Sequence, residues 1–122
     1  MNLLLLMCLA TIVFAGQQTQ ATPYDARIET EWQDGRLQIS NVFENNSPGK
    51  ANFTYKFRCS RQGRSGTSTT SQAGAFQAAP GQTVTLSQTT VSVSPADDLR
   101  LHLDVFRDGK PVATATYSSG QE

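Results

Sequence analysis

Few residues of this chain could carry out chemistry. His102 is the only histidine, and Asp104 stands two positions further on. A histidine oriented by a carboxylate can act as a general base if it also touches a nucleophile. This spacing is also ordinary for a solvated histidine beside an acid, and the sequence does not indicate a nucleophile that His102 would contact. We therefore predict no catalytic residue, no cofactor and no enzymatic activity.

Cys59 is the second candidate, because Cys8 lies in an N-terminal segment that we expect to be removed. A single remaining cysteine cannot form an internal disulfide, and one Cys with one His is too few for a tetrahedral zinc site. Cys59 could be buried, or it could be a reactive thiol if Arg58 and Arg61 lower its pKa. Burial is the simpler expectation, since Cys59 lies on the apolar side of an alternating stretch.

The stretch from Phe57 to Gln72 gathers positive charge and contains no acid. The whole chain is neutral, with ten Lys and Arg against ten Asp and Glu, yet residues 45–96 hold five cations and no acid. Such asymmetry can steer a charged partner. A solvated sheet face that guards an edge against aggregation would give the same pattern. The functional interpretation is an electrostatic contact surface for an acidic or amide-rich polypeptide.

The predicted client-binding residues fall into two groups. One is a basic patch, with the last two residues placed at a turn: Lys56, Arg58, Arg61 and Arg64. The other belongs to a Ser/Thr-rich strand that could form a sheet edge: Thr67, Thr69 and Ser71. So few cations with a neutral total argue against nucleic acid as a partner.

The chain opens with a short apolar run ending in small residues, MNLLLLMCLATIVFAG. A bilayer span needs roughly 20 apolar residues, so residues 1–21 are predicted to be a secretory signal peptide, cut after Ala15 or Ala21. After its removal we expect no membrane insertion. Residues 22–122 would then form a single domain, which we expect to be monomeric.

Apolar and polar residues alternate in ANFTYKFRCS and in LRLHLDVFR, as in strands with one buried face. Asp34-Gly35 and Asp108-Gly109 are hairpin signals. Seven short strands at this spacing predict an all-β fold, an immunoglobulin-like antiparallel β-sandwich. Trp32 is expected to cover one end. The predicted core comprises Ile28, Leu37, Ile39, Phe53, Tyr55, Phe57, Val84, Leu86, Val91, Val93, Leu99, Leu101, Leu103 and Val105.

The segments RQGRSGTSTTSQ and APGQTVTLSQTTVSVSPADDLRLHLDVFRDGK resemble the CsgC/CsgH family of curli assembly proteins, closest to its CsgH-type branch. The resemblance covers Lys50 to Lys110 best. It implies an immunoglobulin-like domain in the periplasm of a Gram-negative bacterium. It also implies a chaperone-like partner of curli amyloid subunits, which prevents their premature polymerisation.

One feature departs from that family. The CsgC-type branch carries a Cys-x-Cys pair near the start of the strand that here reads Ala51-Asn52-Phe53, and no cysteine stands there. Two alternatives to an amyloid inhibitor stay open at this point. One is a structural or adhesive fibre-associated domain, and the other is a thiol-redox protein that uses Cys59.

Overall fold

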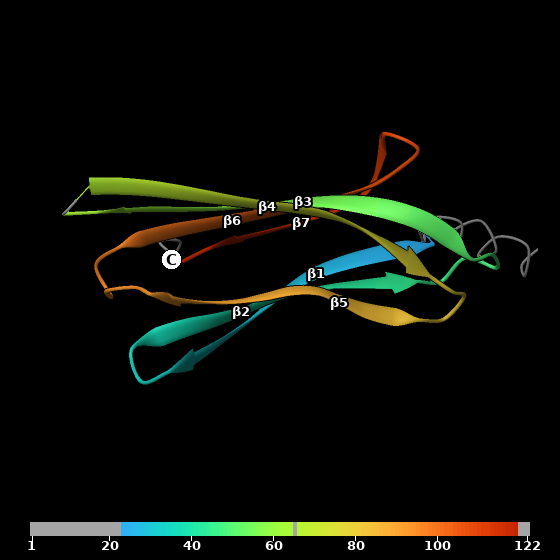
Figure 1. The fold of residues 1–122 in the computed structure, drawn as a ribbon. Coiled ribbons are helices and arrows are strands. Elements are labelled where there is room, and N and C mark those ends of the chain that lie inside the picture. The colour runs from blue at the N-terminus through green and yellow to red at the C-terminus, as the bar shows by residue number, and fades with distance from the viewer. Residues whose placement is uncertain (1–22, 65, 120–122) are drawn as a thin grey trace, which may run out of the picture.

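The computed structural model describes residues 23–64 and 66–119, and all regular elements in this part of the chain are strands (Figure 1). The predicted signal peptide, residues 1–21, lies outside the described residues. Within them, no helix is long and apolar enough to cross a membrane. The strands are β1 (Tyr24–Gln33), β2 (Arg36–Asn45), β3 (Ala51–Gly63), β4 (Gly66–Ala78), β5 (Thr83–Ser92), β6 (Asp98–Arg107) and β7 (Lys110–Ser118).

The strands form two antiparallel sheets that lie one above the other (Figure 1). One sheet has the order β1-β2-β5 and the other β4-β3-β6-β7. This confirms the predicted immunoglobulin-like sandwich. In the constant-type arrangement the fourth strand joins the first, second and fifth. Here the short connection between Gly63 and Gly66 holds β4 against β3 in the larger sheet.

Both predicted Asp-Gly hairpins adopt the backbone that these residues favour. Asp34 and Gly35 have φ angles of 52° and 79°, and Asp108 and Gly109 have 55° and 78°. Two consecutive positive φ angles are the signature of the type I′ turn, whose twist matches that of the flanking strands. The two turns therefore fix the β1–β2 and β6–β7 hairpins.

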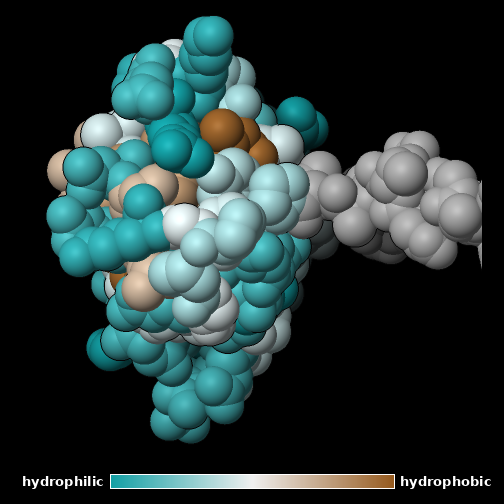
Figure 2. Space-filling view, turned by 90° about the vertical axis from the view of Figure 1, so that its right-hand side faces the viewer, coloured by the Kyte–Doolittle hydropathy of each residue, from teal (hydrophilic) through white to brown (hydrophobic). Residues whose placement is uncertain are grey.

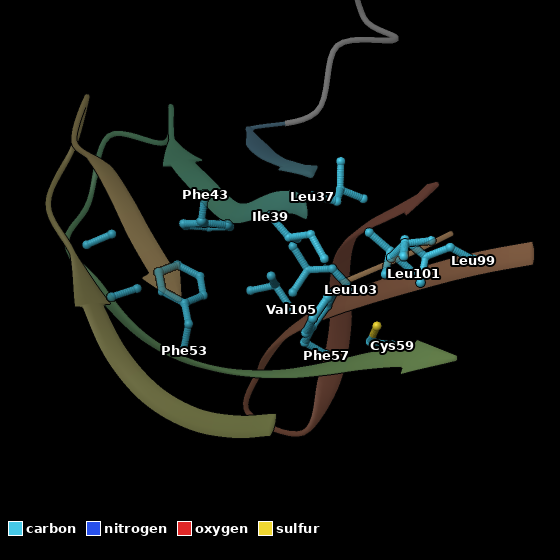
Figure 3. Close-up of a cluster of buried hydrophobic side chains, with 13 residues drawn as sticks. Leu37, Ile39, Phe43, Phe53, Phe57, Cys59, Leu99, Leu101, Leu103 and Val105 are labelled. Atoms are coloured by element: carbon cyan, nitrogen blue, oxygen red, sulfur yellow. The ribbon is translucent and has the colours of Figure 1, made fainter. Parts of the chain in front are cut away.

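The core lies between the sheets, where side chains from β2, β3 and β6 point toward one another (Figure 3). All of the predicted core residues are buried or packed against the core, which confirms the alternation from which they were predicted. Aromatic rings fill the end where β1 begins. The rings of Phe43 and Phe53 lie 4.8 Å apart between centroids, and Phe76 packs on both.

Phe43 is fully buried although it was not among the predicted core residues. The preceding interior position of β2 is polar Asn41, which interrupts the apolar alternation in the sequence. Asn41 is itself buried, and its amide donates a hydrogen bond to Ser87 Oγ at 2.8 Å.

Asn45 is a second buried polar residue, and it ties the end of β2 to its surroundings. Its Nδ2 donates to the carbonyl oxygens of Ala78 at 3.0 Å and Gly49 at 3.1 Å. Its Oδ1 accepts from the Ser47 backbone N–H at 2.9 Å. These bonds satisfy the buried amide and hold the β2–β3 connection against the end of β4.

The expectation that Trp32 covers one end of the core is wrong, because its side chain is 51% exposed. Trp32 lies near the tip of the β1–β2 hairpin, which diverges there from the other sheet (Figure 1). Seen from the opposite end, where β1 begins, the surface is mostly hydrophilic with small hydrophobic spots (Figure 2). That end therefore offers no broad apolar contact surface.

Candidate functional site

The outward side of the four-stranded sheet is hollowed and polar. The strand register aligns Ser71 of β4, Arg58 of β3, His102 of β6 and Thr116 of β7 in one row across this side. The hollow is open and has a volume of about 1310 Å³. We call this surface the hollow face, and its charged and polar lining includes Lys56, Arg58, Ser60, Arg100, His102 and Asp104.

Lys56 and Arg58 lie together on the hollow face, as the alternation predicts. Both side chains are exposed. Lys56 Nζ lies 5.7 Å from the centroid of the Phe106 ring, within the range of a cation–π contact. Within residues 23–64 and 66–119 neither cation forms an ion pair. Both charges are therefore available to an external carboxylate.

Arg61 is not part of this surface. Its predicted place in a turn is wrong, because β3 continues to Gly63. An odd-numbered residue of β3 faces the other sheet, as Cys59 does. Arg61 accordingly reaches across the sandwich, where its Nη1 donates to the Ser92 carbonyl oxygen of β5 at 2.8 Å. Arg64 does lie in the β3–β4 turn and is exposed, but it does not line the hollow.

The hollow face also contains charges that the basic stretch did not predict, all of them from β6. Arg100 adds a cation, and its Nη2 lies 3.5 Å from Asp98 Oδ2. His102 Nε2 lies 3.0 Å from both carboxylate oxygens of Asp104. Thr114 Oγ1 donates to the same carboxylate at 2.9 Å. The two acids offset part of the positive charge, so the face is mixed with a small cationic excess.

The predicted His102–Asp104 proximity is thus present, but its surroundings are those of a solvent-exposed hydrogen-bonded pair. The side chains of His102 and Asp104 are 52% and 32% exposed. The Thr114 hydroxyl beside the pair donates to Asp104. Among the described residues no group of three or more His, Cys, Asp or Glu could hold a metal ion.

Thr67, Thr69 and Ser71 lie on β4, which is an edge strand, as predicted. All three are exposed. They pair with Gln62, Ser60 and Arg58, respectively, and so point to the same side as the basic residues of β3. The hydroxyl-bearing edge and the cations therefore form one continuous surface. That the surface binds a client stays a prediction.

Cys59 is buried and unpaired, as expected from its side of the strand. Its sulfur lies at the Leu99–Leu101 end of the core (Figure 3). Burial raises the pKa of the thiol, and this outweighs the opposing effects of the Thr70 hydrogen bond and the Arg61 charge. The protonated thiol is therefore the stable form near neutral pH, which is the opposite of an activated thiolate.

The outward side of the three-stranded sheet is acidic. Asp25, Glu29 and Glu31 lie along the edge strand β1. Arg27 lies between them, with its Nη1 2.8 Å from Asp25 Oδ2 and its Nε 3.4 Å from Glu29 Oε2. The hydrogen bond to Asp25 is the main cause of a raised pKa for this guanidinium. The acids of β1 thus lie on the opposite side of the sandwich from Lys56 and Arg58.

Fold and surface together define an immunoglobulin-like β-sandwich module with a polar sheet face. Comparison with known families gives a more specific result. The family model described as CsgH protein matches residues 25–116. The chain belongs to the CsgH family.

Two solved structures resemble the whole domain. The solution structure of CsgH from R. palustris is 24% identical, with a TM-score of 0.62, over 79% of this chain and 92% of that chain. The E. coli curli protein CsgC is 18% identical, with a TM-score of 0.64, over 80% of this chain and 99% of that chain. These likenesses show the fold.

A similar sandwich recurs as a small part of larger chains. A beta-glucuronidase from Bacteroides uniformis is 13% identical with a TM-score of 0.56, over 79% of this chain but only 14% of that chain. The fold alone therefore carries no information about activity. A search among curated proteins gives no match.

Proposed function

We propose that this chain is a periplasmic, chaperone-like protein without enzymatic activity that delays amyloid polymerisation of curli subunits during curli biogenesis. Membership of the CsgH family supports involvement in curli biogenesis. The resemblance to an E. coli curli protein agrees with that role. The contact that we propose is electrostatic, between early client species and the hollow face.

The observation that carries this proposal is the exposed, unpaired state of Lys56 and Arg58 on one sheet face. On the other sheet, by contrast, Arg27 of the edge strand β1 is held in bridges to Asp25, Glu29 and Glu44. Cations without internal partners retain their full attraction for carboxylates on another chain. Arg64 in the β3–β4 turn extends this field, whereas Arg61 is excluded from it by its bond to Ser92.

Weak electrostatic contacts suit the proposed task. Amyloid grows when flat strands add edge to edge, and only early species need to be intercepted. Charge complementarity mainly raises association rates, so contacts can be fast and short-lived. One molecule could then act on many subunits in succession.

The thiol alternative finds no support in the geometry. Cys59 is buried, and burial raises its pKa. No second cysteine is present among the described residues to form an exchanging pair.

The experiment is a fibrillation assay with a purified curli subunit, followed by amyloid-dye fluorescence. A substoichiometric amount of the mature chain should lengthen the lag, and the double variant Lys56→Glu/Arg58→Glu should lose most of this effect. The matched control is Arg36→Glu/Lys110→Glu, which makes the same change in charge at the exposed first residues of β2 and β7, outside the lining of the hollow face. No lag extension by the wild type would refute the function, and equal loss in both variants would refute the site.

A further inference from the structure

The sandwich has four edge strands, β1, β5, β4 and β7, and their protection against pairing with other chains differs. Exposed edges are normally guarded by charges, proline or bulges. Edge β1 has Asp25, Arg27, Glu29 and Glu31. Edge β7 opens with Lys110-Pro111, and its pairing with β6 has a register irregularity.

Edge β5 has no charge, but side chains from β3 already occupy part of its backbone. Tyr55 Oη donates to the Leu86 carbonyl oxygen at 3.4 Å, and Arg61 Nη1 donates to that of Ser92 at 2.8 Å. Its pairing with β2 also shifts register at Asn41/Val42. A foreign strand would have to displace these bonds.

Edge β4 has none of these protections. Residues 67–78 contain no charged residue and no proline. Pairing with β3 is continuous from Gly66 to Ala78 without a register shift. No side chain of the described residues bonds to the backbone of residues 66–77, and only Ala78 is capped, by Asn45. Twelve residues of strand present about 40 Å of regular, unguarded edge.

We propose that the β4 edge captures an extended, cation-poor segment rich in Ser, Thr, Asn or Gln by adding it as a fifth strand to the β4-β3-β6-β7 sheet. This inference rests on the proposed function, since the segment would come from the curli subunit. Backbone hydrogen bonds give such an addition its affinity, and small polar side chains on β4 set the partner's chemistry. Hydroxyl and amide side chains on the captured strand would lie opposite Thr67, Thr69 and Ser71 and form cross-strand hydrogen bonds with them.

Charge distinguishes this partner from a second copy of the same chain. The β3–β4 hairpin carries Lys56, Arg58, Arg61 and Arg64 and no acid over residues 51–78. Joining two copies along β4 would bring two such hairpins together with no acid in either. A client strand that lacks cations avoids this repulsion, and any acid it carries would lie two strand spacings, about 10 Å, from β3.

Capture at this edge would oppose amyloid growth for a geometric reason. Fibril templates are flat and untwisted, whereas strands of a sandwich sheet are rotated by roughly 20° or more against their neighbours. A segment held on β4 takes the twist of its host. The hollow face attracts the client, and the edge holds it in a form that cannot be extended as a flat stack.

Hydrogen exchange measured by NMR on the mature chain, with and without a curli subunit, tests the pairing. In an edge strand, every second residue turns its N–H and C=O away from the neighbouring strand. Strand addition should slow exchange at every second amide of residues 67–77, by about tenfold or more, and leave the alternate, already paired amides unchanged. Uniform slowing, or no slowing, while the lag is still extended would overturn the inference and leave the proposed function standing.

Two adjacent substitutions, Thr69→Pro and Thr70→Pro, provide a test with its own control. One of them breaks a bond to β3 and lowers the melting temperature, and the other removes only an outward N–H. The variant that keeps its melting temperature should need about tenfold more chain for the same lag. Thr69→Ala keeps its N–H and should lose only the small contribution of its hydroxyl, and Thr70→Ala, whose residue pairs with inward-facing Cys59, should match the wild type. An undiminished effect of the stable proline variant, or a dimer of the free chain that protects these amides, would contradict the proposal.

Discussion

Arg58 and Arg61 allow the account to be tested by a pair of opposite effects. They lie three residues apart on β3 and are chemically identical, but one faces the hollow face and the other faces the second sheet. We expect Arg58→Gln to weaken inhibition without changing stability. Arg61→Gln should do the reverse.

The stability change follows from the contacts of each side chain. Arg61 donates to Ser92 at 2.8 Å, and a hydrogen bond from a charged donor contributes about 1.5–3 kcal/mol when buried. Because this bond is exposed, about 1 kcal/mol is the appropriate magnitude, which lowers Tm by about 4–8 °C in a domain of this size. Arg58 has no internal partner in the described part of the chain, so its replacement should change the free energy of unfolding by less than about 0.5 kcal/mol.

The effect on inhibition is worked from the same geometry. An exposed ion pair contributes about 0.2–1 kcal/mol. Losing one such contact raises the concentration of Arg58→Gln needed for a given lag by about 1.4- to 5-fold. The dependence on Arg58 should weaken as salt is added, because exposed charges are screened over about 10 Å at 0.1 M ionic strength.

Urea denaturation gives the two stabilities, and dye-monitored lag times give the two inhibition curves, compared at equal concentrations of folded protein. A loss of inhibition by Arg61→Gln equal to that of Arg58→Gln would refute the division of β3 into two functional sides. A marked loss of stability in Arg58→Gln would show that its side chain has an internal role.

Two further predictions concern the interior. Burial raises the Cys59 pKa above its ordinary 9.0, so the folded state holds the proton more tightly than the unfolded chain. The free energy of unfolding, measured by urea denaturation, should therefore fall as pH rises above about 9. Cys59→Ala should lack this fall and still inhibit fibrillation. The same fall in Cys59→Ala would be inconsistent with a thiol origin. Asn45→Ala should cost about 1–3 kcal/mol, because it removes the hydrogen bond to the buried Ala78 carbonyl. Thermal unfolding checks this, with exposed Asn46→Ala as the control, and equal melting temperatures would count against the role of Asn45.

Alternation in the sequence predicted the faces of β3 and β6 correctly, because a period of two follows directly from strand geometry. It placed Lys56 and Arg58 outward and Cys59 inward. The Asp-Gly pairs predicted two hairpins because few other residues tolerate their positive φ angles. Strand alternation and turn conformation depend only on neighbouring residues, so a short stretch of sequence is enough to predict them.

The charge of the hollow face could not be predicted in the same way. Arg100, Asp98 and Asp104 reach it because β6 pairs with β3 across some forty residues of chain. That register depends on the packing of both sheets rather than on any local pattern. Arg61 was misplaced because Gln62-Gly63 suggested that the strand had already ended, whereas β3 continues to Gly63 and the Arg61 side chain bonds to a carbonyl of the second sheet.

The most direct test of the central claim is to map the contact on the folded chain. Amide chemical shifts of the isotope-labelled mature protein would be followed as unlabelled, monomeric curli subunit is added at low salt. We expect the largest changes on β3, β4 and β6 around Lys56, Arg58 and Ser71. Changes confined to the acidic outer side of β1 and β2, or no changes while fibrillation is delayed, would contradict this expectation.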